Sequence, residues 1–85
     1  MIYRFFWGFD AYWFNANGGT GSMSNQVTNV PTALTSNAFT RVGYTFTGWN
    51  TASNGSGTPY ANGATYSFSA DVTLYAQWTD TTMPI

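Results

Sequence analysis

The stretch that decides the fold is Thr40-Arg41-Val42-Gly43-Tyr44-Thr45-Phe46-Thr47-Gly48-Trp49-Asn50. Its side chains alternate with a period of two, so we expect Tyr44 and Phe46 on one side of a strand and threonines on the other. Gly43 permits a turn before this strand, since glycine adopts backbone angles that other residues avoid. Gly48 interrupts the alternation, which indicates a β-bulge before Trp49. The stretch therefore predicts a turn, a half-buried strand and a bulge in succession.

A second strand with the same alternation lies near the end of the chain. Apolar side chains occupy every other position there, at Val72, Leu74, Ala76 and Trp78. This is the pattern of a strand with one buried face. Shorter alternating pieces within residues 23–30 and 64–69 predict two further short strands.

Residues 31–39 form the one stretch that could hold a helical turn. Proline is tolerated at a first helical position, and Leu34 and Ala38 lie four residues apart. Threonine and asparagine residues limit such a helix to one or two turns. The dipeptides Asn54-Gly55 and Asn62-Gly63 predict turns. We therefore expect a mainly β or α+β fold of four or five short strands with at most one short helical crossover.

The core of so small a domain must come from aromatic side chains. They make up 20% of the chain, and there is no cysteine for a disulfide. Each buried ring removes on the order of 150–250 Å² from water. The predicted core consists of Tyr44, Phe46, Trp49, Leu74 and Trp78. If the four aromatic members were exposed they would instead suit a sugar-stacking platform, but their regular alternation favours the core.

The N-terminal residues 2–14 are aromatic on both alternating faces of a predicted strand. A strand that is apolar on both faces needs cover on both, and a domain of 85 residues has one core. We therefore expect one face to form an assembly interface with a neighbouring copy. Its predicted residues are Phe5, Trp7, Phe9 and Trp13. Two alternatives stay open: the segment wraps over its own domain, or it is an artefact.

Scarcity of charge excludes several functions. Arg4 and Arg41 stand against Asp10, Asp71 and Asp80, which gives a net charge of −1, and there is no lysine, glutamate or histidine. Such a chain has no field to attract nucleic acid, and no run of about 18 apolar residues predicts membrane insertion. The usual general bases and metal ligands are missing as well. We expect no catalytic residues, no metal and no cofactor.

Four motifs carry a family resemblance. They are Phe14-Asn15-Ala16-Asn17-Gly18-Gly19, Arg41-x-Gly43-Tyr44-x-Phe46-x-Gly48-Trp49, Tyr60-Ala61-Asn62-Gly63 and Val72-Thr73-Leu74-Tyr75-Ala76-Gln77-Trp78. In this order and spacing the chain resembles the Listeria–Bacteroides repeat, the B-repeat module of internalin-type bacterial surface proteins, over residues 12–78. The resemblance implies a compact β-grasp-like module, found in tandem on secreted or wall-attached proteins as a stalk, spacer or adhesive unit. It brings no catalytic residues.

The resemblance divides the chain into an aromatic N-terminal segment (residues 1–11), a repeat-like module (12–79) and a C-terminal tail (80–85). The aromatic run lies outside the family pattern, because a typical unit opens there with alternating valine and threonine. We expect a non-enzymatic structural or self-assembly module of an extracellular bacterial surface protein or filament. Its N-terminal strand would pair with a neighbouring subunit or repeat. The alternative is an adhesin domain that binds a host glycan or protein.

Overall fold

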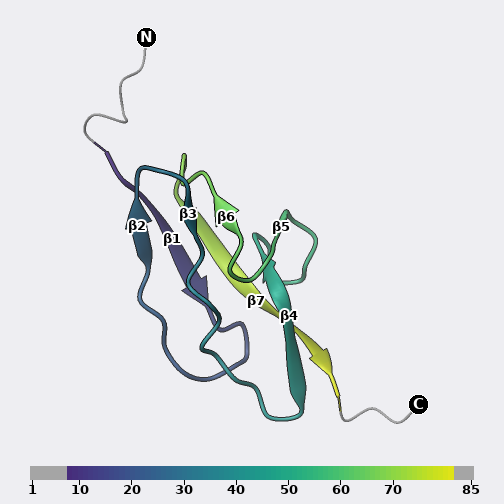
Figure 1. Ribbon diagram of the computed structural model, residues 1–85. Helices are drawn as coiled ribbons and strands as arrows, with labels where there is room; N and C mark the ends of the chain where they lie inside the picture. The colour runs from purple at the N-terminus through teal and green to yellow at the C-terminus, as the bar shows by residue number, and fades with distance from the viewer. Residues whose placement is uncertain (1–7, 82–85) are drawn as a thin grey trace.

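The computed structural model describes residues 8–81, which form seven strands in two sheets. The strands are β1 (Asp10–Asn15), β2 (Gln26–Thr28), β3 (Thr32–Ala33), β4 (Tyr44–Asn50), β5 (Pro59–Tyr60), β6 (Thr65–Tyr66) and β7 (Val72–Asp80). Five of them form the main sheet in the order β2-β1-β7-β4-β5, and β3 and β6 form a second sheet (Figure 1). Residues 8–81 contain no helix.

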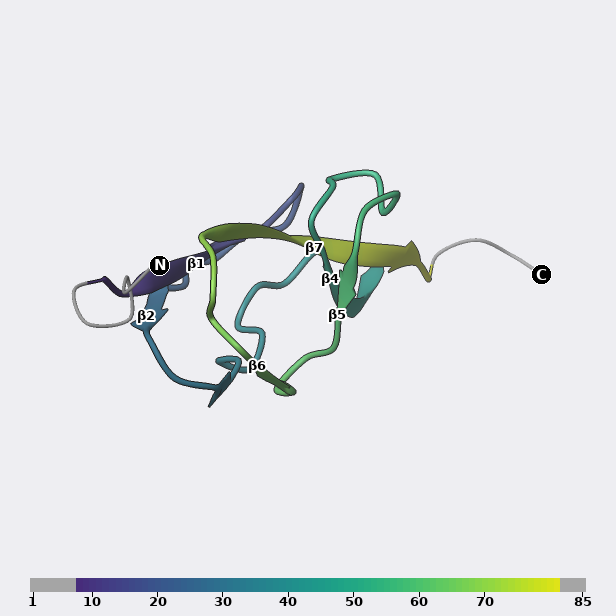
Figure 2. The same ribbon diagram turned by 90° about the horizontal axis from the view of Figure 1, so that it is seen from above.

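The nine-residue β7 is the centre of the main sheet. It runs parallel to β1 on one side and antiparallel to β4 on the other. The two-stranded sheet crosses one face of the main sheet, which we call the inner face. Figure 2 shows β6 on that side of β1, β7 and β4, whereas the loops after β1 and after β4 rise on the opposite side, the outer face.

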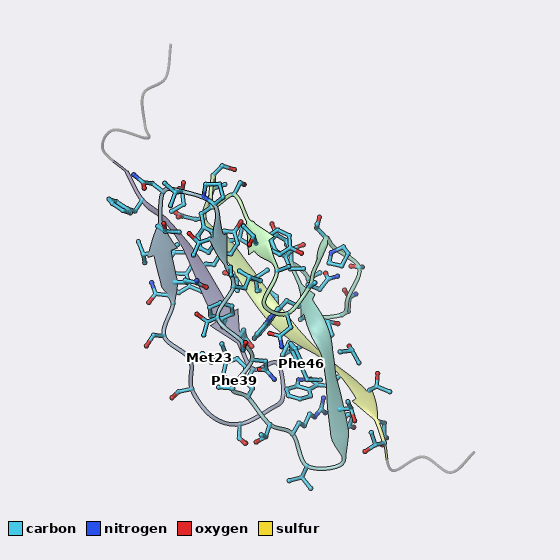
Figure 3. The ribbon with its side chains drawn as sticks, in the orientation of Figure 1. Met23, Phe39 and Phe46 are labelled. Carbon is cyan, nitrogen blue, oxygen red and sulfur yellow. The ribbon has the colours of Figure 1, made fainter. Side chains whose placement is uncertain are left out.

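The core lies between the inner face and the crossing segments. Its buried members come from the strands β1, β4 and β7 and from the crossing segments: Tyr12, Leu34, Phe39, Trp49, Phe68, Leu74 and Ala76. Rings dominate the contacts, with Tyr12 stacked on Phe68 at 3.8 Å between centroids and Phe14 tilted against Trp49 at 4.9 Å. Figure 3 shows Met23, Phe39 and Phe46 at one end of this core. Aromatic packing thus supplies what disulfides supply in other small domains.

The predicted turn, strand and bulge are confirmed in β4. Phe46 pairs with Trp78, but the next pair joins Gly48 to Gln77, so Thr47 is the extra residue of a β-bulge. Gly48 has φ 145°, in the region that favours glycine. The bulge lets β4 bend while Trp49 returns to the inner face opposite Ala76.

Residues 31–39 do not form a helical turn. The main-chain N–H of Leu34 donates to the Ala64 carbonyl at 2.9 Å, beside the ladder that joins β3 to β6. Further along, the Asn37 side chain accepts from the Phe39 N–H, which closes a turn that competes with helix. Leu34 and Phe39 are buried in this extended form. The crossover therefore holds one short strand, β3, and together with β5 it raises the number of strands from the predicted four or five to seven.

Strand limits differ by one or two residues from the predicted module boundaries. β1 begins at Asp10, so two residues of the aromatic segment 1–11 belong to the first strand of the module. β7 extends to Asp80, the first residue of the predicted tail. Residues 1–7 and 82–85 lie outside the described part of the chain.

Candidate functional site

The two faces of β1 have opposite surroundings. Tyr12 and Phe14 point to the inner face, where Tyr12 is buried and Phe14 packs against the core. Phe9 and Trp13 occupy the alternate positions, whose side chains point to the outer face. They are 60% and 43% exposed. Val27 of β2 pairs with Ala11 of β1 and is 53% exposed. Phe9, Trp13 and Val27 therefore form an apolar patch on the outer face, which we call the outer patch.

The outer patch contains two of the four residues predicted for an assembly interface, Phe9 and Trp13. The other two, Phe5 and Trp7, lie outside the described residues. Val27 is a further member of the patch that lies outside the predicted interface. Its place in a short, partly exposed strand next to β1 is the signal that could have identified it.

The predicted core residues are at different depths. Trp49 and Leu74 are 1% and 0% exposed. Phe46 and Trp78 are half-buried and pack against the core, with their ring centroids 5.7 Å apart. Tyr44 is half-buried at the start of β4, and the guanidinium carbon of Arg41 lies 3.7 Å from its ring centroid. Burial of Trp49 removes the central ring from a sugar-stacking platform.

Three of the family motifs meet at the loop that follows β1. The Asn17 side-chain amide donates to the carbonyls of Ser53 and Ala76, each at 2.8 Å. The Trp78 indole N–H donates to the Ala16 carbonyl at 2.9 Å. These bonds join the loop to the last strand and to the loop between β4 and β5, so the motif residues hold the module together.

The loop after β1 requires glycine at positions 18 and 19, because neighbouring atoms leave no space for a Cβ atom. A Cβ on Gly19 would lie 2.7 Å from the Trp78 ring and 2.8 Å from the Thr40 carbonyl oxygen. A Cβ on Gly18 would lie 3.2 Å from the Arg41 guanidinium carbon. The glycine pair therefore has a packing role at this junction.

A second polar anchor is Asn50, which is 5% exposed. Its side-chain oxygen accepts from the N–H groups of Ala52 and Gly57, both at 2.9 Å, and its amide donates to the Gly55 carbonyl at 3.2 Å. Asn50 thereby folds the loop between β4 and β5 onto the outer face. This role of Asn50 was not predicted, although an asparagine just before a glycine-rich loop is a signal for it.

A shallow groove of about 590 Å³ lies where β5 leaves β4. Its walls include Thr47 and Gly48 from β4 and the rings of Tyr60 and Tyr66, whose centroids are 4.4 Å apart. Gln77 also lines it. The groove thus combines two tyrosine rings with the polar residues Thr47 and Gln77.

Titratable groups are few in the described part of the chain. Burial, with a smaller contribution from the Tyr60 hydroxyl, raises the pKa of Tyr12 to about 12. The Asp71 carboxylate accepts a hydrogen bond from the main-chain N–H of Ala11 at 2.9 Å. It therefore holds the beginning of β1 against the end of the loop that precedes β7. Residues 8–81 hold no group of three or more side chains suited to binding a metal ion.

Residues 8–81 contain no helix that is long and apolar enough to cross a membrane.

Similar proteins include two from Evansella cellulosilytica. One, named "Putative Gly-rich membrane protein", is 60% identical over 37 residues, which are 42% of this chain and 4% of that protein. The other, named "Putative membrane protein", is 54% identical over 39 residues, which are 45% of this chain and 6% of that protein. The aligned region is therefore a small fraction of each relative. No solved structure is similar to the chain.

The pattern of the Listeria-Bacteroides repeat domain matches residues 13–77, which is more than half of the chain. The matched region begins in β1, ends in β7 and includes the loop, bulge and turn motifs that meet in the fold. This family is a non-catalytic repeat family typical of cell-surface proteins. The chain belongs to the Listeria–Bacteroides repeat domain family.

Proposed function

We propose that the chain is a non-enzymatic structural module of an extracellular bacterial surface protein or filament, and that its N-terminal aromatic strand pairs with a neighbouring subunit. The observation that carries this proposal is the outer patch. Phe9, Trp13 and Val27 expose large apolar surfaces on the side of the sheet that lies opposite the core. Contiguous exposed apolar side chains of this kind mark interaction sites.

The chemistry of the chain favours a structural role over a catalytic one. Histidine, cysteine, lysine and glutamate are absent from the sequence. Of the three aspartates, Asp10 is buried and Asp71 bonds a main-chain N–H. Serine and threonine hydroxyls therefore lack the side-chain base that would activate them as nucleophiles.

Low charge and family membership support the surface setting. A net charge of −1 gives little repulsion between copies, which favours association. The two Evansella proteins carry the word membrane in their names, and each is much longer than the aligned region. A repeat module within a long surface protein meets its neighbours at high local concentration, so weak contacts between modules suffice.

Analytical ultracentrifugation of the full chain over a wide concentration range tests the proposal. We expect species larger than a monomer, and we expect them to disappear when residues 1–7 are deleted or when Phe9→Ser and Trp13→Thr are combined. The matched control is Val42→Thr, because Val42 is fully exposed at the turn before β4, away from the outer patch. A chain that is monomeric at every concentration would contradict the proposal.

The groove beside β5 supports a second candidate function, an adhesin domain that binds a host glycan or protein. Tyr60 and Tyr66 offer ring faces there, next to Gln77. Binding to a glycan array by the monomer, abolished by Tyr60→Ala and kept in the Val42→Thr control, would support this function. Absence of binding to any glycan on the array would speak against the glycan form of it.

A further inference from the structure

We propose that the open edge of β4, residues 44–47, is the acceptor for residues 2–7 of a second copy of the chain. This inference rests on the proposed function and names the surface that receives the N-terminal strand. An incoming strand would extend the main sheet beyond β4, by the same main-chain pairing that joins β4 to β5.

The edge is open because β5 is short. β5 pairs with Trp49 and Asn50, at one end of the seven-residue β4 (Figure 1). The remaining part of β4, residues 44–47, pairs with β7 on one side, and no other strand within residues 8–81 pairs with it on the opposite side. Four residues of strand correspond to about 13 Å, enough to pair most of a six-residue segment.

The main-chain groups on this edge face outward. The Thr81 N–H donates to the Gly43 carbonyl at 2.9 Å, which makes Gly43 and Thr81 a hydrogen-bonded pair. Pairs of an antiparallel ladder alternate, so the main-chain groups of Tyr44 and Phe46 point away from β7. The Tyr44 N–H bonds the Arg41 carbonyl. The Tyr44 carbonyl and both main-chain groups of Phe46 are therefore directed toward an added strand.

The strand that covers one end of β4 carries a proline, and the open part of β4 does not. β5 begins with Pro59. Proline and charged side chains are the usual means of preventing edge pairing. Residues 44–47 contain neither. The acceptor edge ends at Thr47 in the direction of β5, because the β-bulge and then the groove follow there.

The side chains of the edge match the segment proposed to occupy it. Phe46 lies at one end of the core (Figure 3), where it is half-buried. Its ring packs against the rings of Trp49 and Trp78. An apolar side chain on an added strand would cover the exposed part of Phe46. Residues 2–7 are Ile-Tyr-Arg-Phe-Phe-Trp, apolar at five of six positions.

Distance shows that the donor comes from another copy. β1 runs parallel to β7, with Tyr12 opposite Val72. Phe46 of β4 is opposite Trp78 of β7. Asp10 therefore lies about 26 Å along β7 from the level of Phe46. Residue 2, the far end of the segment, is eight positions from Asp10 and can reach at most about 29 Å in any direction, and residue 7 can reach about 11 Å. An added strand beyond β4 would also lie three strand spacings, or about 14 Å, to the side of β1, so the segment is too short to lie along residues 44–47. The segment cannot pair with this edge in its own subunit. When the donor and the acceptor are different surfaces of the same chain, each copy can bind the next, so the contact propagates as a filament.

Disulfide mapping tests this inference, because the chain has no cysteine of its own. Two populations of the full chain are mixed and mildly oxidised, one with Thr45→Cys and the other with Tyr3→Cys, Arg4→Cys or Phe5→Cys. Thr79→Cys is the matched control, since Thr79 is exposed directly opposite Thr45 but on β7, one strand away from the edge. We expect at least about tenfold more mixed disulfide at Thr45 than at Thr79, because a disulfide requires Cβ atoms about 4 Å apart.

The outcomes separate the two proposals. Assembly with equal or greater cross-linking at Thr79, or at Val27→Cys on β2, would overturn the acceptor edge and leave the proposed function standing. A chain that stays monomeric in the ultracentrifuge would overturn both.

Discussion

Aromatic side chains lie on both faces of the main sheet, but the two faces have different surroundings. On the inner face, Tyr12 and Trp49 are covered by the crossing segments and are almost inaccessible to water. On the outer face, Trp13 lies one residue from Tyr12 and keeps 43% of its surface exposed. Neighbouring aromatic residues on one strand thus have separate roles, one in stability and one in contact. Substitutions on the two faces should therefore have different consequences.

The largest effect is expected on the inner face, from Trp49→Ala. This ring is fully buried and contacts Phe14, Phe39 and Phe46. Its loss should lower the free energy of unfolding by about 3–5 kcal/mol, measured by urea denaturation. The indole N–H of Trp49 is buried without a hydrogen-bond partner among residues 8–81. Trp49→Phe, which removes that N–H and keeps a ring, should therefore cost less than Trp49→Ala.

High pH probes the same face without a substitution. The pKa of Tyr12 is raised from 10.0 to about 12 in the folded chain. The folded state disfavours the phenolate form of Tyr12, so the neutral side chain contributes to the free energy of unfolding. This contribution is fully present below pH 10 and is lost as the pH rises from 10 to 12. We expect a loss of about 2–3 kcal/mol across that window in urea denaturation. The control, Tyr12→Phe, should show a smaller pH dependence, and an unchanged dependence would contradict the assignment.

Packing of the loop after β1 is tested by Gly19→Ala. The added methyl group would meet the Trp78 ring and the Thr40 carbonyl oxygen, so we expect a loss of about 1–3 kcal/mol in thermal or urea unfolding. Gly63→Ala is the matched control, because a Cβ at Gly63 has no atom within 4 Å and only the positive φ of 75° opposes it. A larger loss at Gly63 than at Gly19 would show that backbone angle outweighs packing in this fold.

The smallest effect on stability is expected on the outer face, from Trp13→Thr. Trp13 is opposite Thr73 and has no described ring partner, so the free energy of unfolding should change by less than about 0.5 kcal/mol. The same substitution should weaken association in the ultracentrifuge. A loss of stability comparable to that of Trp49→Ala would show that both faces contribute to a single core, and the contrast between them would then be false.

Prediction from sequence was most successful where one residue pattern determines one structure. Alternation predicted β4 and β7, and Gly48 marked the bulge between Phe46 and Trp49. The crossing segments were harder, because Leu34 and Phe39 carry no regular period and the alternation within residues 64–69 does not reveal the turn of the backbone at Phe68. Phe68 is buried with φ 51°, a backbone angle rare for an aromatic residue, and its stacking on Tyr12 stabilises it there.

The sequence by itself determined that this chain is a cysteine-free, nearly uncharged β module of the Listeria–Bacteroides repeat family, because alternation and glycine positions are local properties. Only the tertiary structure decided which aromatic residues are buried. Tyr12 and Trp13 are equally apolar in the sequence, and they differ because the β3–β6 crossing covers one side of the sheet and leaves the other uncovered within residues 8–81. That choice depends on contacts between residues more than 50 positions apart, such as Tyr12 with Phe68, which no local pattern encodes.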